Sequence, residues 1–280
     1  GAFYNSSMTI LGDSITFNAE STDGETTDAI SIYVNYGSTV TVGSDTTSKV
    51  TVGGSVDVNR SNLTIKGNEI EIGTTGTLDL EFSQVGEGTV TIGDDTTKSV
   101  AIDNMVSLQA STTGSNTRAT ITGDTVTLGG IVDVYGTGAA LTVDGTDISL
   151  TLSESYASEL SDAMRAFYGG SISLGSSRTE SLTVSGQVTS RSSFVYNNIT
   201  YAEDTAVSLN GNTITLENGA LATGSGASIT IGDAGVTETL SGDLTATDGG
   251  VITATLSGAY TGDATASDAG TLTLTTGSAT

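Results

Sequence analysis

The ten residues from Leu63 to Ile72 read LTIKGNEIEI, and the same pattern recurs along the chain. Ungapped near-copies are MTILGDSITF (8–17), ATITGDTVTL (119–128), LTVDGTDISL (141–150) and VSLNGNTITL (207–216). In every copy, apolar and polar residues alternate on both sides of a glycine that is followed by Asp, Asn or Thr. Such alternation predicts two short β-strands that flank a bend.

The bend constrains how the two strands are joined. Leu63 and Ile65 share one strand face, and Ile70 and Ile72 share another. Because Ile65 and Ile70 are five residues apart, a straight strand would place the two pairs on opposite faces. A corner in a solenoid coil would keep both pairs pointing inward, and a two-residue hairpin would also fit the glycine. The bend alone leaves both arrangements open.

The spacing of the copies favours the solenoid. They begin at residues 8, 63, 119, 141 and 207, which gives intervals of 55, 56, 22 and 66 residues. These intervals are close to multiples of a unit of roughly 22 to 28 residues, the kind of period that stacked coils show. A hairpin meander would need no common period. We therefore predict an all-β fold, a right-handed parallel β-solenoid.

Two further repeats agree with this period. VTVGSDTTSKVTV (40–52) returns as VTIGDDTTKSVAI (90–102) and ISLGSSRTESLTV (172–184), and SGDLTATDGG (241–250) returns as TGDATASDAG (261–270). We expect the polar loops 44–49 and 94–99 to project from the side of the coil. No stretch resembles a linker, so residues 1–280 are interpreted as a single elongated solenoid. Because the sequence stops in repeat material, we also expect it to be a fragment of a longer chain.

The composition restricts the function. Thirty-two acidic residues and eight basic ones give a net charge of −24, which disfavours binding to nucleic acid or to anionic lipid. The absence of Cys and His removes thiol nucleophiles, His-based triads and zinc sites with these ligands. No Ca²⁺-loop spacing is present and no apolar run approaches membrane-helix length. We predict no cofactor, no metal site and no membrane insertion of this segment.

The acidic residues do not suggest an enzyme. Asp94 with Asp95 and Glu203 with Asp204 are adjacent pairs, and neighbours on a strand point to opposite faces. Neither pair is a natural acid/base couple of the kind that cleaves polysaccharides. A non-enzymatic protein is predicted, with a polysaccharide-degrading β-helix as a weaker alternative.

One stretch breaks the repeat. In SESYASELSDAMRAFYGG (153–170), Tyr156, Leu160, Ala163, Met164 and Phe167 fall at helical spacing, and two glycines close the segment. This pattern predicts a short amphipathic helix as an insert at about residues 153–170.

Aromatic residues and arginines concentrate around this insert, where Arg165, Arg178 and Arg191 are three of the chain's five arginines. Such enrichment is typical of recognition surfaces. The predicted binding residues are Tyr156, Arg165, Phe167, Tyr168, Phe194, Tyr196 and Tyr201. The alternative interpretation is that the helix only packs its apolar face on the side of the solenoid.

Thr-x-Thr pairs are frequent, for example Thr39 with Thr41, Thr89 with Thr91 and Thr273 with Thr275. A flat, regular ladder of such pairs could bind ice. Their spacing along the sequence is irregular, so ordinary strand propensity explains them better.

The units LTIKGNEIEI and VTIGDDTTKSVAI, with the Gly-Ala-Thr-rich tail, resemble passenger domains of autotransporter adhesins from diderm bacteria. The resemblance implies a right-handed β-helix that is exported through an outer-membrane barrel and stays at the extracellular cell surface. The expected role is that of an adhesin or structural stalk, which contacts a protein or glycan of a host or neighbouring cell. A self-associating surface-layer or filament subunit is the alternative.

Overall fold

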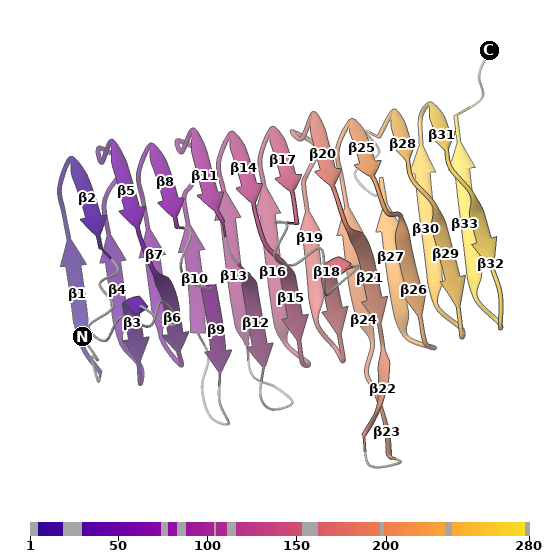
Figure 1. Cartoon of the computed structure of the whole chain (residues 1–280), viewed down its shortest axis with the longest axis horizontal. Coiled ribbons are helices and arrows are strands. Elements are labelled where there is room, and N and C mark those ends of the chain that lie inside the picture. Colours follow the sequence, from indigo (N-terminus) through magenta and orange to yellow (C-terminus); the bar gives the residue numbers. More distant parts are fainter. Residues whose placement is uncertain are drawn as a thin grey trace.

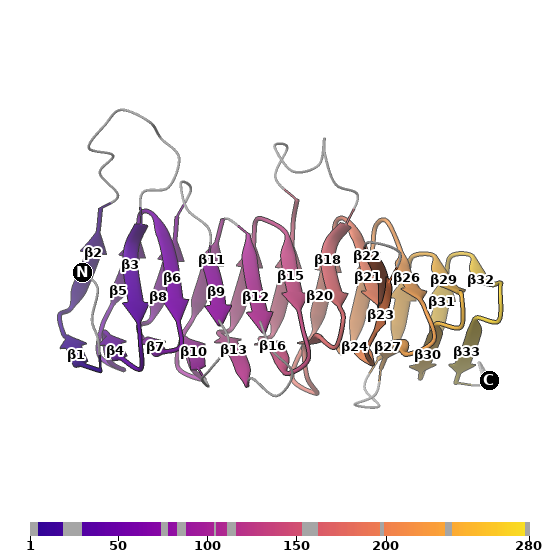
Figure 2. The same cartoon turned by 90° about the horizontal axis from the view of Figure 1, so that it is seen from below.

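The computed structural model describes residues 5–18, 30–73, 78–82, 88–103, 105–110, 116–152, 162–196, 199–232 and 237–277. The chain winds as a parallel β-solenoid, and three long sheets run side by side from its first coils to its last (Figures 1 and 2). Every strand pair in these three sheets is parallel. The predicted all-β solenoid is confirmed, and a meander of hairpins is excluded.

Each sheet takes one strand from successive coils. The 11-stranded sheet, sheet A, contains β1 (Ser7–Ile10), β4 (Thr39–Val42), β7 (Asn62–Ile65), β10 (Gly88–Ile92), β13 (Thr117–Thr122), β16 (Ala139–Asp144), β19 (Ser171–Leu174), β24 (Thr205–Leu209), β27 (Ala227–Ile231), β30 (Val251–Leu256) and β33 (Thr271–Thr276). Sheet B contains β2 (Ser14–Phe17), β5 (Lys49–Val52), β8 (Glu69–Ile72), β11 (Ser99–Ile102), β14 (Thr125–Leu128), β17 (Asp147–Leu150), β20 (Ser181–Val184), β25 (Thr213–Leu216), β28 (Thr239–Ser241) and β31 (Ala259–Thr261).

Sheet C contains β3 (Ile30–Asn35), β6 (Ser55–Asn59), β9 (Leu78–Phe82), β12 (Val106–Ala110), β15 (Val132–Tyr135), β18 (Asp162–Phe167), β21 (Gln187–Arg191), β26 (Ala220–Thr223), β29 (Leu244–Thr247) and β32 (Ala264–Ala266). A separate antiparallel hairpin consists of β22 (Ser193–Tyr196) and β23 (Ile199–Ala202). The hairpin follows β21 in the chain and projects beyond the ends of the neighbouring strands (Figure 1).

The bend in the repeat is a coil corner. Leu63 and Ile65 of β7 and Ile70 of β8 are all 0% exposed, and Ile72 is 1% exposed. Both apolar pairs therefore point into the core, as the solenoid interpretation requires. At the corner, the amide of Asn68 donates to the carbonyl of Thr47 on the preceding coil, at 2.8 Å. Neighbouring coils thus satisfy the polar backbone groups that the bend leaves open.

Three of the longer corners between sheet A and sheet B carry a buried threonine. Thr47, Thr97 and Thr179 are at most 2% exposed, and each Oγ1 donates to a glycine carbonyl one coil earlier, at 2.6–2.9 Å. The acceptors are Gly12, Gly67 and Gly145. The expectation that loops 44–49 and 94–99 project is therefore wrong for Thr47 and Thr97, because a buried hydroxyl needs a partner and finds one in the adjacent coil.

The predicted helix at 153–170 is wrong wherever the structure describes it. Asp162–Phe167 is strand β18, which pairs in parallel with β15 on one side and β21 on the other; residues 153–161 lie outside the described residues. The adjacent apolar residues Ala163 and Met164 fit a helical spacing in the sequence. In the structure both are buried, because the register of the strand shifts between Asp162 and Met164. Pairing with two neighbouring coils outweighs the local helical pattern.

The outer face of sheet A carries an unbroken hydroxyl ladder. One residue from each of its strands is in register with the next: Thr9, Thr41, Thr64, Thr91, Thr120, Thr142, Ser173, Ser208, Thr230, Thr253 and Thr273. Strands are ~4.8 Å apart, so ten steps extend the ladder over about 48 Å. The sequence spacing between threonines is irregular, but coil corners absorb the differences in length, and the ladder is regular in space.

Candidate functional site

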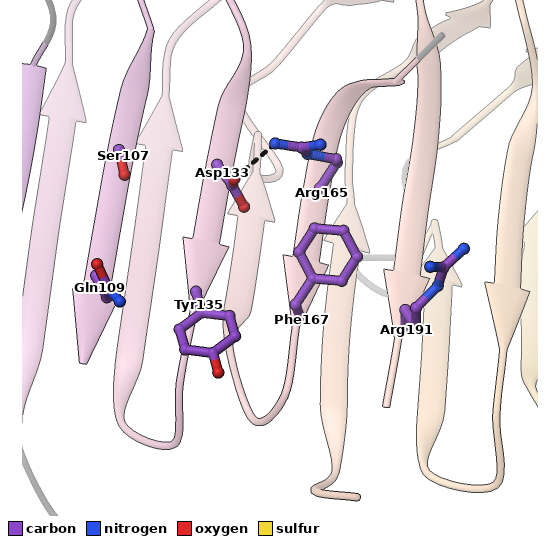
Figure 3. A pocket seen from close by; sticks show the side chains of 7 residues that line it. All are labelled: Ser107, Gln109, Asp133, Tyr135, Arg165, Phe167 and Arg191. Atoms are coloured by element: carbon purple, nitrogen blue, oxygen red, sulfur yellow. Dashed lines mark hydrogen bonds and ion pairs between the residues drawn. The ribbon is translucent and has the colours of Figure 1, made fainter. Parts of the chain in front are cut away.

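A pocket opens on the outer face of sheet C, across four neighbouring strands. It has a volume of about 380 Å³ and is lined by Ser107 and Gln109 of β12, Asp133 and Tyr135 of β15, Arg165 and Phe167 of β18, and Arg191 of β21. Figure 3 shows their side chains on one face of the sheet. The volume falls within the range of small-molecule sites, about 300–1,000 Å³.

Strand alternation aims these side chains outward. In β18, Met164 and Ala166 are fully buried, so Arg165 and Phe167 between and after them face away from the core. The parallel register then places equivalent residues beside one another: Asp133 next to Arg165, and Tyr135 next to Phe167. The pocket is therefore a product of register between coils that are distant in sequence.

Arg165 and Asp133 form an ion pair in the wall of the pocket. The Arg165 Nη2 lies 2.7 Å from Asp133 Oδ2, and the side chains are 19% and 24% exposed. Burial raises the pKa of the Asp133 carboxyl above its ordinary value, although the charge and the hydrogen bond of Arg165 oppose this. Asp162 nearby raises the same pKa further. The pair is thus poorly solvated, and each partner depends on the other.

The aromatic rings of the site contact guanidinium groups or each other. The Phe167 ring centre lies 5.4 Å from the Arg165 guanidinium carbon and 5.9 Å from that of Arg191, within the range of cation–π attraction. Tyr135 stacks on Tyr168, with ring centres 5.9 Å apart. These contacts hold flat apolar surfaces beside positive charge.

The structure brings together only part of the predicted binding set. Arg165 and Phe167 line the pocket, and Tyr168 supports it by stacking on Tyr135. Phe194, Tyr196 and Tyr201 belong to the hairpin, where Phe194 is in register with Tyr201; their side chains lie outside the described residues, as does Tyr156 altogether. The hairpin starts two residues after Arg191.

Sequence reasoning missed most of the pocket. Asp133 and Tyr135 come from a stretch about 30 residues earlier, and Ser107 and Gln109 from one coil before that. Arg191 belongs to the local arginine enrichment, but the sequence alone does not place it among the binding residues. An alignment of successive coils strand by strand would have been the signal, because outward positions of neighbouring coils are adjacent in space.

Within the described residues, no group of three or more Asp or Glu residues is arranged to hold a metal ion. The same part of the chain contains no helix that is long and apolar enough to cross a membrane. The fold and the pocket together define a parallel β-solenoid with a pocket on its side wall. No protein-family model, curated protein or solved structure matches the chain.

Proposed function

We propose that this chain is a non-enzymatic, rod-shaped part of an extracellular bacterial surface protein of the autotransporter-passenger type. In this proposal it acts as an adhesin, and the pocket on sheet C contacts a partner on a host or neighbouring cell. The observation that carries the proposal is the outward-facing cluster of aromatic and arginine side chains on one wall of a long, regular rod. Such residues are enriched at the centres of binding surfaces.

The chemistry of the pocket favours binding over hydrolysis. Glycoside hydrolysis generally uses two carboxylates on either side of the scissile bond. Among the residues that line this pocket, Asp133 is the single carboxylate, and it is already paired with Arg165. A polysaccharide-degrading enzyme would be indicated instead by the release of reducing ends from acidic glycans.

An adhesion assay tests the proposal. Beads coated with the purified chain should bind a panel of bacterial and animal cells, and the double variant Tyr135→Ala/Phe167→Ala should lower the number of bound cells several-fold, because it removes the apolar surfaces of the pocket. Tyr36→Ala is the matched control, since Tyr36 is also an exposed aromatic beside an arginine, Arg60. Unchanged adhesion of the double variant, with an unchanged circular dichroism spectrum, would refute the pocket as the contact site.

The outer face of sheet A favours a second candidate function, self-association. Beside the hydroxyl ladder runs a second outward row: Ser7, Thr39, Asn62, Thr89, Arg118, Ala140, Ser171, Ala206, Ser228, Val251 and Thr271. Neither row contains an acidic residue, although the chain carries 32. Two rods of charge −24 repel each other, and these two rows, in which Arg118 is the one charged residue, are where the rods can approach with the least repulsion.

Sedimentation at several salt concentrations tests this second candidate. Higher salt should strengthen the pairing of rods, because it screens their mutual repulsion. Thr120→Glu, in the middle of the ladder, should weaken pairing by about tenfold or more, since like charges would face each other across the interface. Thr127→Glu is the control, because Thr127 lies on the outer face of sheet B. Rods that stay monomeric at every salt concentration would rule self-association out.

A further inference from the structure

One guanidinium of the pocket is not neutralised by a neighbouring acid. In the described part of the chain, Arg165, Arg178, Lys49 and Lys66 lie within salt-bridge distance of a carboxylate, whereas Arg191 does not. Arg191 is exposed, and its guanidinium carbon lies 5.9 Å from the centre of the Phe167 ring. The ring orients the guanidinium without consuming its hydrogen-bond donors.

The side chains that line the pocket therefore carry a net positive charge. Arg165 and Asp133 cancel each other, which leaves the charge of Arg191. The remaining chain is strongly acidic, but charges beyond about 8 Å are largely screened at physiological ionic strength. An anion inside the pocket would respond to Arg191 more than to the distant acidic surface.

The order of side chains along the rod gives the pocket a direction. Gln109, Tyr135, Phe167 and Arg191 are consecutive in register on four strands, so each step is ~4.8 Å. A polar amide stands at one end, two aromatic rings in the middle and the guanidinium at the other end (Figure 3). Ser107 adds a hydroxyl beside Gln109 on the same strand.

We propose that the pocket binds a glycan through a sugar unit that bears a carboxylate. The fork of Arg191 donates two hydrogen bonds to the carboxylate. The apolar C–H face of the sugar ring lies against the surfaces of Tyr135 and Phe167, and its hydroxyls bond to Gln109 and Ser107. This inference rests on the proposed adhesin function, because it names the ligand class of that same site.

A carboxylated sugar fits the pocket better than an acidic peptide does. A peptide carboxylate would satisfy Arg191, but its flexible side chain offers no flat, rigid ring for the aromatic surfaces. A uronic acid presents the charge, an apolar face and several hydroxyls within one ring. The lining residues offer a partner for each of these three features.

Calorimetric titration of the whole purified chain tests the inference. Oligomers of galacturonic acid should bind, and their methyl esters, which keep the ring and lose the charge, should bind at least tenfold more weakly. Arg191→Gln should lower affinity for the acid about tenfold or more, because a charge-assisted contact is lost. Arg118→Gln is the matched control, since Arg118 is also exposed but lies on sheet A. The affinity of this variant for the galacturonic acid oligomers should equal that of the unmodified chain.

The outcomes separate the ligand class from the adhesin role. Equal binding of acid and ester, or full affinity in Arg191→Gln, overturns the carboxylate inference. If an acidic peptide binds in an Arg191-dependent manner and the uronic acid does not, the inference is also overturned. In both cases the adhesin role stands as long as Tyr135→Ala/Phe167→Ala still lowers adhesion to cells several-fold. Unchanged adhesion of that double variant removes the pocket as the contact site, whatever the glycan titration shows.

Discussion

Replacing Gly93 by alanine should lower the free energy of unfolding by about 3 kcal/mol or more. Gly93 has a φ of +72°, a conformation that costs a residue with a Cβ about 1–2 kcal/mol. In addition, a Cβ there would lie 2.1 Å from the carbonyl oxygen of Thr122 on the next coil. That oxygen belongs to the backbone, so the coils would have to separate locally.

The same geometry recurs at three other corners. Gly43, Gly175 and Gly232 have φ values of +78°, +75° and +77°, and a Cβ at each would meet a backbone carbonyl oxygen at 2.0–2.1 Å. Alanine at Gly175 should therefore behave like alanine at Gly93. The corners with a buried threonine thus require glycine for two independent reasons.

Chemical denaturation followed by circular dichroism measures this effect. Gly123→Ala is the matched control, because Gly123 sits at a corner of the neighbouring coil and a Cβ there would find its closest atom, Val100 Cγ2, at 3.3 Å. Its expected cost is about 1 kcal/mol or less. Equal midpoints for Gly93→Ala and Gly123→Ala would show that the coils can move apart without penalty.

Replacing Arg165 by methionine should cost about 3 kcal/mol at neutral pH, because it leaves the carboxylate of Asp133 largely buried without a partner. Asp133→Asn/Arg165→Met should regain most of this loss, since the neutral amide has no charge to desolvate. Lys49→Met is the comparison at a more exposed pair, Lys49 with Glu71, where solvent screens the interaction and the midpoint of unfolding should hardly change.

The pH dependence of the Arg165→Met variant follows from Asp133. Its pKa is raised above 3.8 in the folded chain, so the folded state holds the proton more tightly than the unfolded state does. The stability from this group is full below pH 3.8 and is lost as the pH rises through the folded pKa. Arg165 lowers that pKa, so its removal raises the pKa further. The penalty of Arg165→Met should thus shrink as the pH falls from 7 toward 4.

Urea denaturation at pH 7 and at pH 4 measures the difference. A penalty that is the same at both pH values would mean that Arg165 stabilises sheet C by packing alone, without neutralising Asp133. The double variant provides an internal check, because its stability should not depend on the titration of residue 133.

Local sequence patterns predict the core but not the surface of this rod. The inward positions of LTIKGNEIEI follow from alternation and from the glycine bend, and the burial of Leu63, Ile65, Ile70 and Ile72 agrees. The helix at 153–170 was wrong for 162–167 because helical spacing and a buried Ala163–Met164 pair look alike within one short segment. The competing strand pairings involve β15 and β21, and no local pattern contains them.

The pocket and the hydroxyl ladder depend on register between coils. Asp133 meets Arg165, and Thr120 meets Thr142, because particular strands pair in a particular offset. Corner lengths vary along the chain, so this offset cannot be obtained from a fixed period. The sequence therefore indicated that arginines and aromatics gather near residue 165, while the partners from earlier coils could be identified only from the strand pairing.

Position on this molecule is measured by the number of turns and not by the number of amino acids. The chain uses 35 residues to pass from Ser173 to Ser208 and 20 to pass from Thr253 to Thr273, yet each passage advances the rod by the same ~4.8 Å. The distance along the rod therefore depends on the number of coils and not on the length of the loops at their corners. Adding or deleting one complete coil before β12 would shift the pocket along the rod by ~4.8 Å and leave its internal geometry intact.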